Sequence, residues 1–238
     1  MHSRAAAIAT ALGLMFAASA VSARGELQAG PTLLEIQPGA TSTRLQLSNT
    51  GDELVAAQVR VYAWTQVDGE DQLQETDVVV ASPPIAEVPA GGEHLVRVVL
   101  AGPAPTDGRD RAYRVVVDEL PGSADADTSG VRVRMRFVLP AFVRSKGAKA
   151  PALSCHLRDG DTRLACRNSG GQPAQLGATT LVAGASKLAL SEGLFGYVLP
   201  GSERLWTLPT ERPALAGTMT LDTWINGQAA TVTVERRP

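Results

Sequence analysis

Few residues of this chain have the types and spacing that catalysis requires. Asp118 and Glu119 are adjacent carboxylates, and a carboxylate pair can act as general acid and general base. Adjacent residues of a strand point to opposite faces, however, so these two cannot share a proton as a dyad. The sequence also has no Gly-x-Ser-x-Gly turn, no phosphate-binding loop and no His/Cys cluster. It therefore predicts a protein that is not an enzyme and that holds neither a metal nor a cofactor.

The two cysteines, Cys155 and Cys166, are the other residues with chemistry of their own. A zinc site would need further ligands, and outside the first 23 residues the only histidines are His94 and His156. The spacing fits a β-hairpin that turns at residues 160–161 and sets the two cysteines opposite each other. In an oxidising compartment we expect a disulfide, and two buried free thiols are the alternative.

The run from Val131 to Pro140 alternates apolar and cationic side chains with a period of two. On the predicted strand the apolar face carries Val131, Val133, Met135 and Phe137, and the other face carries Arg132, Arg134 and Arg136. A half-buried core strand of an antiparallel sheet has this pattern. An edge strand that offers its apolar row to another protein has the same pattern, so the surroundings must decide.

Short strand-like runs separated by turn residues fill the first half of the chain, without helical periodicity. The predicted strands are 32–36, 44–48, 54–64, 78–80, 95–100, 113–117 and 131–140. Seven short strands at this spacing predict an immunoglobulin-like sandwich, in which the 131–140 run is the last strand and lies at an edge.

A second β series follows the polar segment from Arg144 to Pro151, which we interpret as the domain boundary. Its predicted strands are 153–157, 163–167, 175–182, 187–190, 204–208, 218–225 and 229–234. They predict a smaller sandwich or partial barrel, with Asn226-Gly227 as a hairpin turn. The apolar loop 193–201 packs under a sheet or against the first domain, or else it binds a partner. We expect one domain over residues 24–145 and another over 146–238.

The N-terminus has the features of a secretory signal peptide over residues 1–23. A short basic region precedes an uncharged apolar run, which ends in small-x-small sites at Ala20 and Ala23. A transmembrane anchor is the alternative, but the run is short for a span. The formal net charge of -2 does not indicate a nucleic-acid partner, so a protein partner is expected.

Several stretches, taken in order, resemble the periplasmic chaperones of bacterial chaperone/usher pilus assembly. They are residues 47–51, 59–66, 82–84, 96–98, 113–121, 131–144 and 196–201. The residues in these stretches are most similar to those of the archaic branch, the Csu-type or spore-coat-U-like chaperones. The resemblance implies an all-β chain of two immunoglobulin-like β-sandwich domains, arranged as a boomerang with an interdomain cleft.

The function that the resemblance implies is donor-strand complementation in the periplasm. A pilus subunit lacks the final strand of its own sandwich, and the last strand of the chaperone's first domain fills the resulting apolar groove. By position the inserted side chains would be Val131, Val133 and Met135, with Phe137 as a further candidate. The implied partners are pilus subunits and an outer-membrane usher, with no nucleic acid and no stable membrane insertion.

The sequence departs from this family where the subunit's C-terminal carboxylate is anchored. Chaperones of type 1 and P pili use an arginine in the first strand and a lysine in the last, and the matching positions here are Leu33 and Pro140. A buried carboxylate still needs a cation or amide donors. Arg114 is the first candidate because it interrupts an apolar strand, and Arg97 and Lys146 follow.

A second function of a different class also fits an exported two-domain chain. Such a chain could be a structural or adhesive immunoglobulin-like module of a surface fibre. That protein would be found in the assembled fibre, whereas a chaperone stays in the periplasm.

Overall fold

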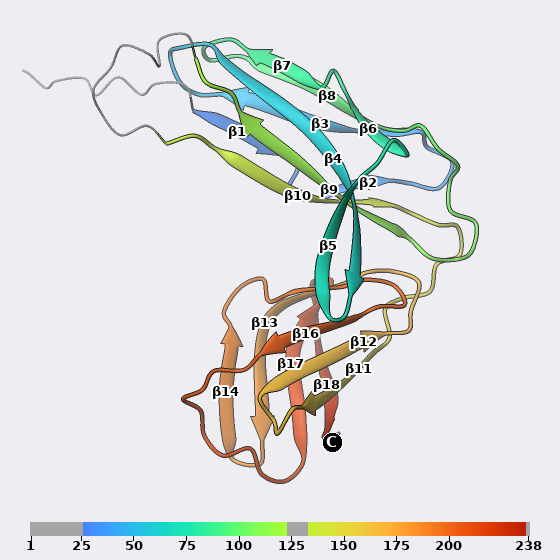
Figure 1. Ribbon diagram of the computed structural model, residues 1–238, viewed down its shortest axis with the longest axis vertical. Helices are drawn as coiled ribbons and strands as arrows, with labels where there is room; N and C mark the ends of the chain where they lie inside the picture. Colours follow the sequence, from blue (N-terminus) through green and yellow to red (C-terminus); the bar gives the residue numbers. More distant parts are fainter. Residues whose placement is uncertain (1–25, 123–132, 237–238) are drawn as a thin grey trace, which may run out of the picture.

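The computed structural model describes residues 26–122 and 133–236, and every regular element in them is a β-strand. Two all-β bodies are connected by the segment after Val143, and a long hairpin of the first body reaches the second (Figure 1). The strands of the first body are β1 Leu27–Gly30, β2 Leu34–Ile36, β3 Ser42–Asn49, β4 Val55–Val67, β5 Glu70–Glu75, β6 Val79–Ser82, β7 Ile85–Val88, β8 Glu93–Leu100, β9 Arg111–Glu119 and β10 Arg136–Val143.

The first body is a sandwich of two sheets. One has the strand order β1-β3-β8-β6, and the other has the order β2-β10-β9-β4-β5, with β7 paired to β4. Alternate residues of the strands point between the sheets because side chains alternate along a strand. Strand β4 behaves in this way, since Val55, Ala57 and Val59 are buried in the core and Val61 and Ala63 pack against it.

The strands β1, β5 and β7 were not predicted. Strand β5 has the clearest reason, because all six of its residues are exposed and it has no apolar face. It is held by backbone pairing to β4 through a hairpin turn in which Asp68 and Gly69 both have positive φ. Hydrophobic periodicity cannot detect a strand that buries no side chain.

The strand predicted at 131–140 begins and ends later than expected. Strand β10 covers Arg136–Val143, so Pro140 lies inside it rather than at its end, and Val131 and Arg132 lie outside the described residues. Pro140 faces Arg114 of β9, and on the other side pairing with β2 starts only at Ala141. A proline is tolerated there because its missing N–H leaves no broken ladder bond. Within the described residues, the part of β10 before Ala141 therefore has one open edge.

The second body is one eight-stranded sheet with the path β14-β13-β17-β18-β11-β12-β16, to which β15 adds beside β13. Its strands are β11 Leu153–Arg158, β12 Arg163–Asn168, β13 Ala174–Ala183, β14 Ser186–Ser191, β15 Gly196–Val198, β16 Glu203–Thr207, β17 Met219–Ile225 and β18 Gln228–Arg236. Leucines from β11, β12, β13 and β17 meet in one buried core, so the sheet folds over itself. The Asn226-Gly227 turn joins β17 to β18 with positive φ at both residues, as predicted.

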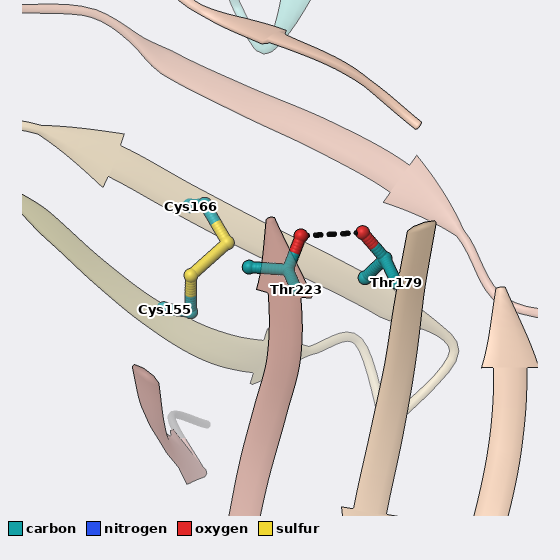
Figure 2. The surroundings of a disulfide bond; sticks show 4 residues. All are labelled: Cys155, Cys166, Thr179 and Thr223. Atoms are coloured by element: carbon teal, nitrogen blue, oxygen red, sulfur yellow. Dashed lines mark hydrogen bonds between the residues drawn. A yellow bond between two sulfur atoms is a disulfide. The ribbon is translucent and has the colours of Figure 1, made fainter. Parts of the chain in front are cut away.

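The predicted disulfide joins Cys155 to Cys166 on the paired strands β11 and β12 (Figure 2). The two residues are direct partners in the antiparallel register, with a Cα–Cα distance of 4.1 Å, and both belong to the core of the second body. Beside them the hydroxyls of Thr179 and Thr223 are hydrogen-bonded at 2.7 Å, which satisfies two buried polar groups. The disulfide therefore closes a short loop within the core.

Loss of this disulfide is expected to destabilise the protein. Cys155→Ala combined with Cys166→Ala should lower the free energy of unfolding by about 3 kcal/mol, the chain-entropy value for a loop of this length. Urea denaturation of the variant and of reduced wild-type protein measures the loss. Alkylation with and without reductant checks the pairing, and two free thiols in protein purified from an oxidising compartment would contradict it.

Candidate functional site

The apolar row that precedes and begins β10 is partly open to solvent. Val133 is 79% exposed and Met135 is 40% exposed, whereas Phe137 is partly buried against the core of the first body. Met135 is tied to the end of β9, because its carbonyl accepts the Glu119 N–H at 3.0 Å and its own N–H donates to Glu119 Oε2 at 3.0 Å. Of the four residues predicted to insert into a partner, the structure thus leaves Val133 and Met135 exposed, and Val131 lies outside the described part.

The cationic face of the same strand is paired with acid from β9. Asp118 accepts hydrogen bonds from Arg136 and from Arg60, the latter at 2.5 Å. Burial of Asp118 opposes its charge, but the hydrogen bonds from the two arginines outweigh burial and lower the pKa of Asp118. Asp118 and Glu119 therefore have different partners, Arg136 and Arg60 for Asp118 and the Met135 N–H for Glu119, and do not form a dyad.

A cluster of aromatic residues joins the two bodies. Trp64 of β4 and Phe142 of β10 meet Tyr197 of β15 and Leu199, which follows β15, and all four are buried. The Trp64 and Tyr197 rings meet edge to face with centroids 5.4 Å apart, and the Phe142 and Tyr197 centroids are 6.0 Å apart. The apolar loop 193–201 therefore packs against the first body.

Arg114 lies on this aromatic cluster. Its guanidinium carbon is 3.6 Å from the Trp64 ring centroid and 5.6 Å from that of Tyr197. Burial lowers the pKa of Arg114, but an arginine keeps its charge at neutral pH. Among the residues that the structure describes, no carboxylate forms an ion pair with Arg114. A half-buried cation whose side chain has no hydrogen-bond partner within residues 26–122 and 133–236 therefore faces the junction of the two bodies.

The other two candidate cations lie elsewhere. Arg97 is exposed on β8, in the other sheet of the first body, where it pairs in register with Arg44 and Ser82. Lys146 is exposed in the turn after β10. The structure does not bring either of them onto the aromatic cluster with Arg114.

A second arginine, Arg144, was missed by the sequence reasoning. It follows β10 and pairs with Asp110 at 2.6 Å and with Glu35. Asp110 is almost fully buried and also accepts the Ser145 N–H at 2.8 Å. Burial disfavours the charge of Arg144, but the hydrogen bonds to Asp110 and Glu35 outweigh burial and raise its pKa. Only the fold reveals this site, because Asp110 lies in a Gly/Pro/Asp-rich loop that resembles solvent-exposed turns.

Removal of the buried carboxylate should weaken the start of the interdomain segment. Asp110→Ala is expected to lower the free energy of unfolding by about 2 kcal/mol, because charged hydrogen bonds to Arg144 and Ser145 are lost. Urea denaturation measures the change. Asp107→Ala is the matched control in the same loop, and its exposed ion pair with Arg111 should contribute little. Equal effects of the two substitutions would contradict the assignment.

The hairpin β4–β5 connects the two bodies through backbone and side-chain hydrogen bonds. The Gln66 amide donates to the Tyr197 carbonyl at 2.8 Å and accepts the Leu199 N–H at 2.9 Å. At the tip, the Gly69 carbonyl accepts the Leu205 N–H at 3.0 Å, and a Cβ added to Gly69 would lie 1.8 Å from a Leu205 methyl carbon. Only glycine fits this approach, so the hairpin is docked closely on β16.

A cavity of about 490 Å³ lies beside the hairpin tip between the two bodies. Its charged lining mixes both signs, with Arg158 paired to Glu203 and Arg163 paired to Asp159. Within residues 26–122 and 133–236, no three His, Cys, Asp or Glu side chains are grouped to hold a metal. The same ranges contain no helix long and apolar enough to cross a membrane.

The fold and the site together define a two-domain immunoglobulin-like protein with an exposed apolar edge segment and, further along the same pair of strands, an arginine at the interdomain junction. Residues 26–149 match the family model described as pili and flagellar-assembly chaperone, PapD N-terminal domain, and the chain therefore belongs to this family. The predicted family and the predicted all-β fold of two immunoglobulin-like domains are confirmed. A sequence comparison with curated proteins finds no match.

Solved structures of pilus chaperones share this fold. A chain of the CsuC–CsuE chaperone–tip adhesion subunit pre-assembly complex, from archaic chaperone-usher Csu pili of Acinetobacter baumannii, is 24% identical with a TM-score of 0.73 over 90% of this chain and 100% of that one. The E. coli chaperone DraB is 19% identical with a TM-score of 0.61, over 88% and 97%. A chain of the Salmonella enterica SafA pilin–SafB chaperone complex is 16% identical with a TM-score of 0.62, over 87% and 95%.

Proposed function

We propose that this protein is a periplasmic chaperone that binds pilus subunits by donor-strand complementation and delivers them to an outer-membrane usher. The observation that carries the proposal is the exposed apolar row at the open edge of the first domain, in a chain that belongs to a family of pilus-assembly chaperones. The residues of the motifs and the similarity in fold to a chain of the Csu complex support the assignment of this protein to the archaic branch.

The binding free energy expected from the exposed apolar row suits both binding and release of a subunit. Burial of each apolar side chain gains about 1.5 to 3 kcal/mol before ordering costs are counted. Val133 and Met135, with Val131 as a further contributor, would hold a subunit firmly, and Phe137 would add to them only by leaving the core against which it packs. A strand of the next subunit that fills the groove better would displace them, so release would need no nucleotide.

The anchor for the subunit's C-terminal carboxylate is proposed to be Arg114. In the sheet register Pro140 is the partner of Arg114, and Leu33 is one residue before the first β2–β10 pair, Leu34 with Ala141. Pro140 and Arg114 are therefore direct neighbours, and Leu33, just before β2, continues the same row. The two positions that carry cations in chaperones of type 1 and P pili are uncharged here. In this protein the positive charge comes instead from Arg114 on the neighbouring strand β9.

The cell location and the usher partner belong to the same proposal. The basic-then-apolar pattern of residues 1–23 supports export, and these residues lie outside the described part of the structure. The disulfide in the second domain is compatible with an oxidising compartment.

Co-expression of the full chain with the pilus subunit encoded by a neighbouring gene tests the proposed function. A soluble one-to-one complex in the periplasmic fraction is expected, with the subunit degraded or aggregated when the chaperone is absent. Recovery of this protein in the assembled surface fibre would instead support the structural or adhesive module and contradict the chaperone role.

A further inference from the structure

Arg114 lies close to two aromatic rings that come from different domains. Trp64, which lies under the guanidinium, belongs to the first domain, and Tyr197 belongs to the second. We propose that Tyr197 and Gln66 are positioning residues for Arg114, so that the carboxylate anchor is complete only while the two domains remain docked. This inference rests on the proposed function, because it concerns the same arginine.

The orientation of the guanidinium depends on the Trp64 ring. A guanidinium 3.6 Å from a ring centroid is attracted to the ring face, and its N–H donors then point outward in its own plane. A planar donor fork held in this way matches the two oxygens of a carboxylate. Stacking on Trp64 therefore prepares Arg114 to recognise a carboxylate before any ligand arrives.

The Trp64 ring is in turn held by packing rather than by a hydrogen bond. Its side chain is buried, and its Nε1 has no hydrogen-bond partner among the described residues. Its aromatic neighbours are Phe142, with centroids 6.2 Å apart, and Tyr197, which it meets edge to face. The second domain contributes Tyr197 and Leu199 to this cluster, and Tyr197 is its aromatic member, so a shift of that domain would loosen Trp64 and Arg114 together.

Gln66 fixes the segment that carries Tyr197. Gln66 follows Trp64 by two residues on β4, so both side chains lie on the same face of the sheet. Its amide bonds to the Tyr197 carbonyl and the Leu199 N–H, which flank Val198. The Gln66 side chain of the first domain thus fixes the backbone of the second domain on both sides of Val198, next to the Tyr197 ring. Gln66 itself does not need to contact the ligand.

The test compares two forms of one synthetic peptide, the C-terminal segment of the neighbouring-gene subunit with either a free carboxylate or a C-terminal amide. The full-length chaperone should bind the free acid about tenfold more tightly than the amide, because Arg114 pairs with the carboxylate. Gln66→Ala and Tyr197→Ala are expected to reduce this ratio to about two while affinity for the amide stays unchanged. Tyr197→Phe keeps the ring and should keep the ratio.

Controls separate this inference from the proposed function and from loss of fold. Gln72→Ala, on the exposed strand β5, removes a glutamine that has no side-chain hydrogen bond to the second domain's described residues, and it should keep the ratio. If Gln66→Ala and Tyr197→Ala both keep the tenfold preference for the free-acid peptide and only Arg114→Ala loses it, the inference is wrong. The assignment of Arg114 as the carboxylate anchor would still hold. If Arg114→Ala keeps the preference for the free-acid peptide, the assignment of Arg114 as the carboxylate anchor is wrong. Loss of amide binding in Gln66→Ala and Tyr197→Ala, or a collapsed circular dichroism spectrum, would overturn the positioning role in favour of a general structural one.

Discussion

Val133→Asp combined with Met135→Asp is expected to abolish the complex with the pilus subunit while the chaperone stays folded. Each substitution would place a carboxylate in the apolar groove of the subunit, and an unpaired charge in such a site costs several kcal/mol. The fold should tolerate both changes, because Val133 is 79% exposed and Met135 is 40% exposed in the free protein. Co-purification from periplasmic extracts, with circular dichroism of the free variant, measures both effects.

A matched control uses exposed apolar residues that are outside the proposed row. Val138 points to the opposite face of β10, and Leu73 lies on β5; both are 47% exposed. Val138→Asp combined with Leu73→Asp adds the same charge to the first domain and should leave the complex intact. If the Val133 and Met135 double variant still retained the subunit, the donor-strand assignment would be wrong.

Arg114→Ala is expected to weaken subunit binding by about 2 kcal/mol or more, the usual loss when one partner of a buried charge pair is removed. Stability of the free chaperone should fall by no more than about 1 kcal/mol, the loss of stacking on Trp64, because Arg114 forms no ion pair among the described residues and burial already disfavours its charge. Arg114→Lys should restore little, since an ammonium lacks the planar fork and stacks poorly on Trp64. Competition for the subunit against wild-type chaperone gives the affinity, and thermal melting gives the stability.

Arg97→Ala is the control for the loss of a positive charge. Arg97 is exposed on the other sheet of the first domain, so its removal should change binding only slightly. Equal losses for Arg97→Ala and Arg114→Ala would indicate a diffuse electrostatic effect. No loss for either would mean that another group binds the carboxylate.

Local patterns in the sequence were sufficient for the fold class and the disulfide. Alternation along β4, and turn residues such as Asn226-Gly227, are short-range features that depend only on strand geometry. The register that sets Cys155 against Cys166 also follows from a short hairpin. Ordered motifs along the chain were sufficient for the family, which the match over residues 26–149 confirms.

Strand bounds and the polar strand β5 were less predictable. Sequence alternation extends from Val131 to Pro140, but β10 begins at Arg136 and continues to Val143, because pairing with β9 and β2 determines where a strand starts and ends. Alternation describes which side chains share a face; it does not reveal whether a backbone partner is present. The same limit hid β5, which is defined by pairing alone.

By itself, then, the sequence determined the all-β fold of two domains, the family, the disulfide and a row of apolar side chains that could bind a partner protein. The tertiary structure alone decided which cation faces the interdomain junction: Arg114 lies on Trp64 and near Tyr197, while Arg97 and Lys146 lie elsewhere. It alone also revealed Gln66 as a link between the domains. The physical reason is that these contacts join residues far apart in the chain, and their geometry depends on strand pairing within the first domain and on how the two domains dock.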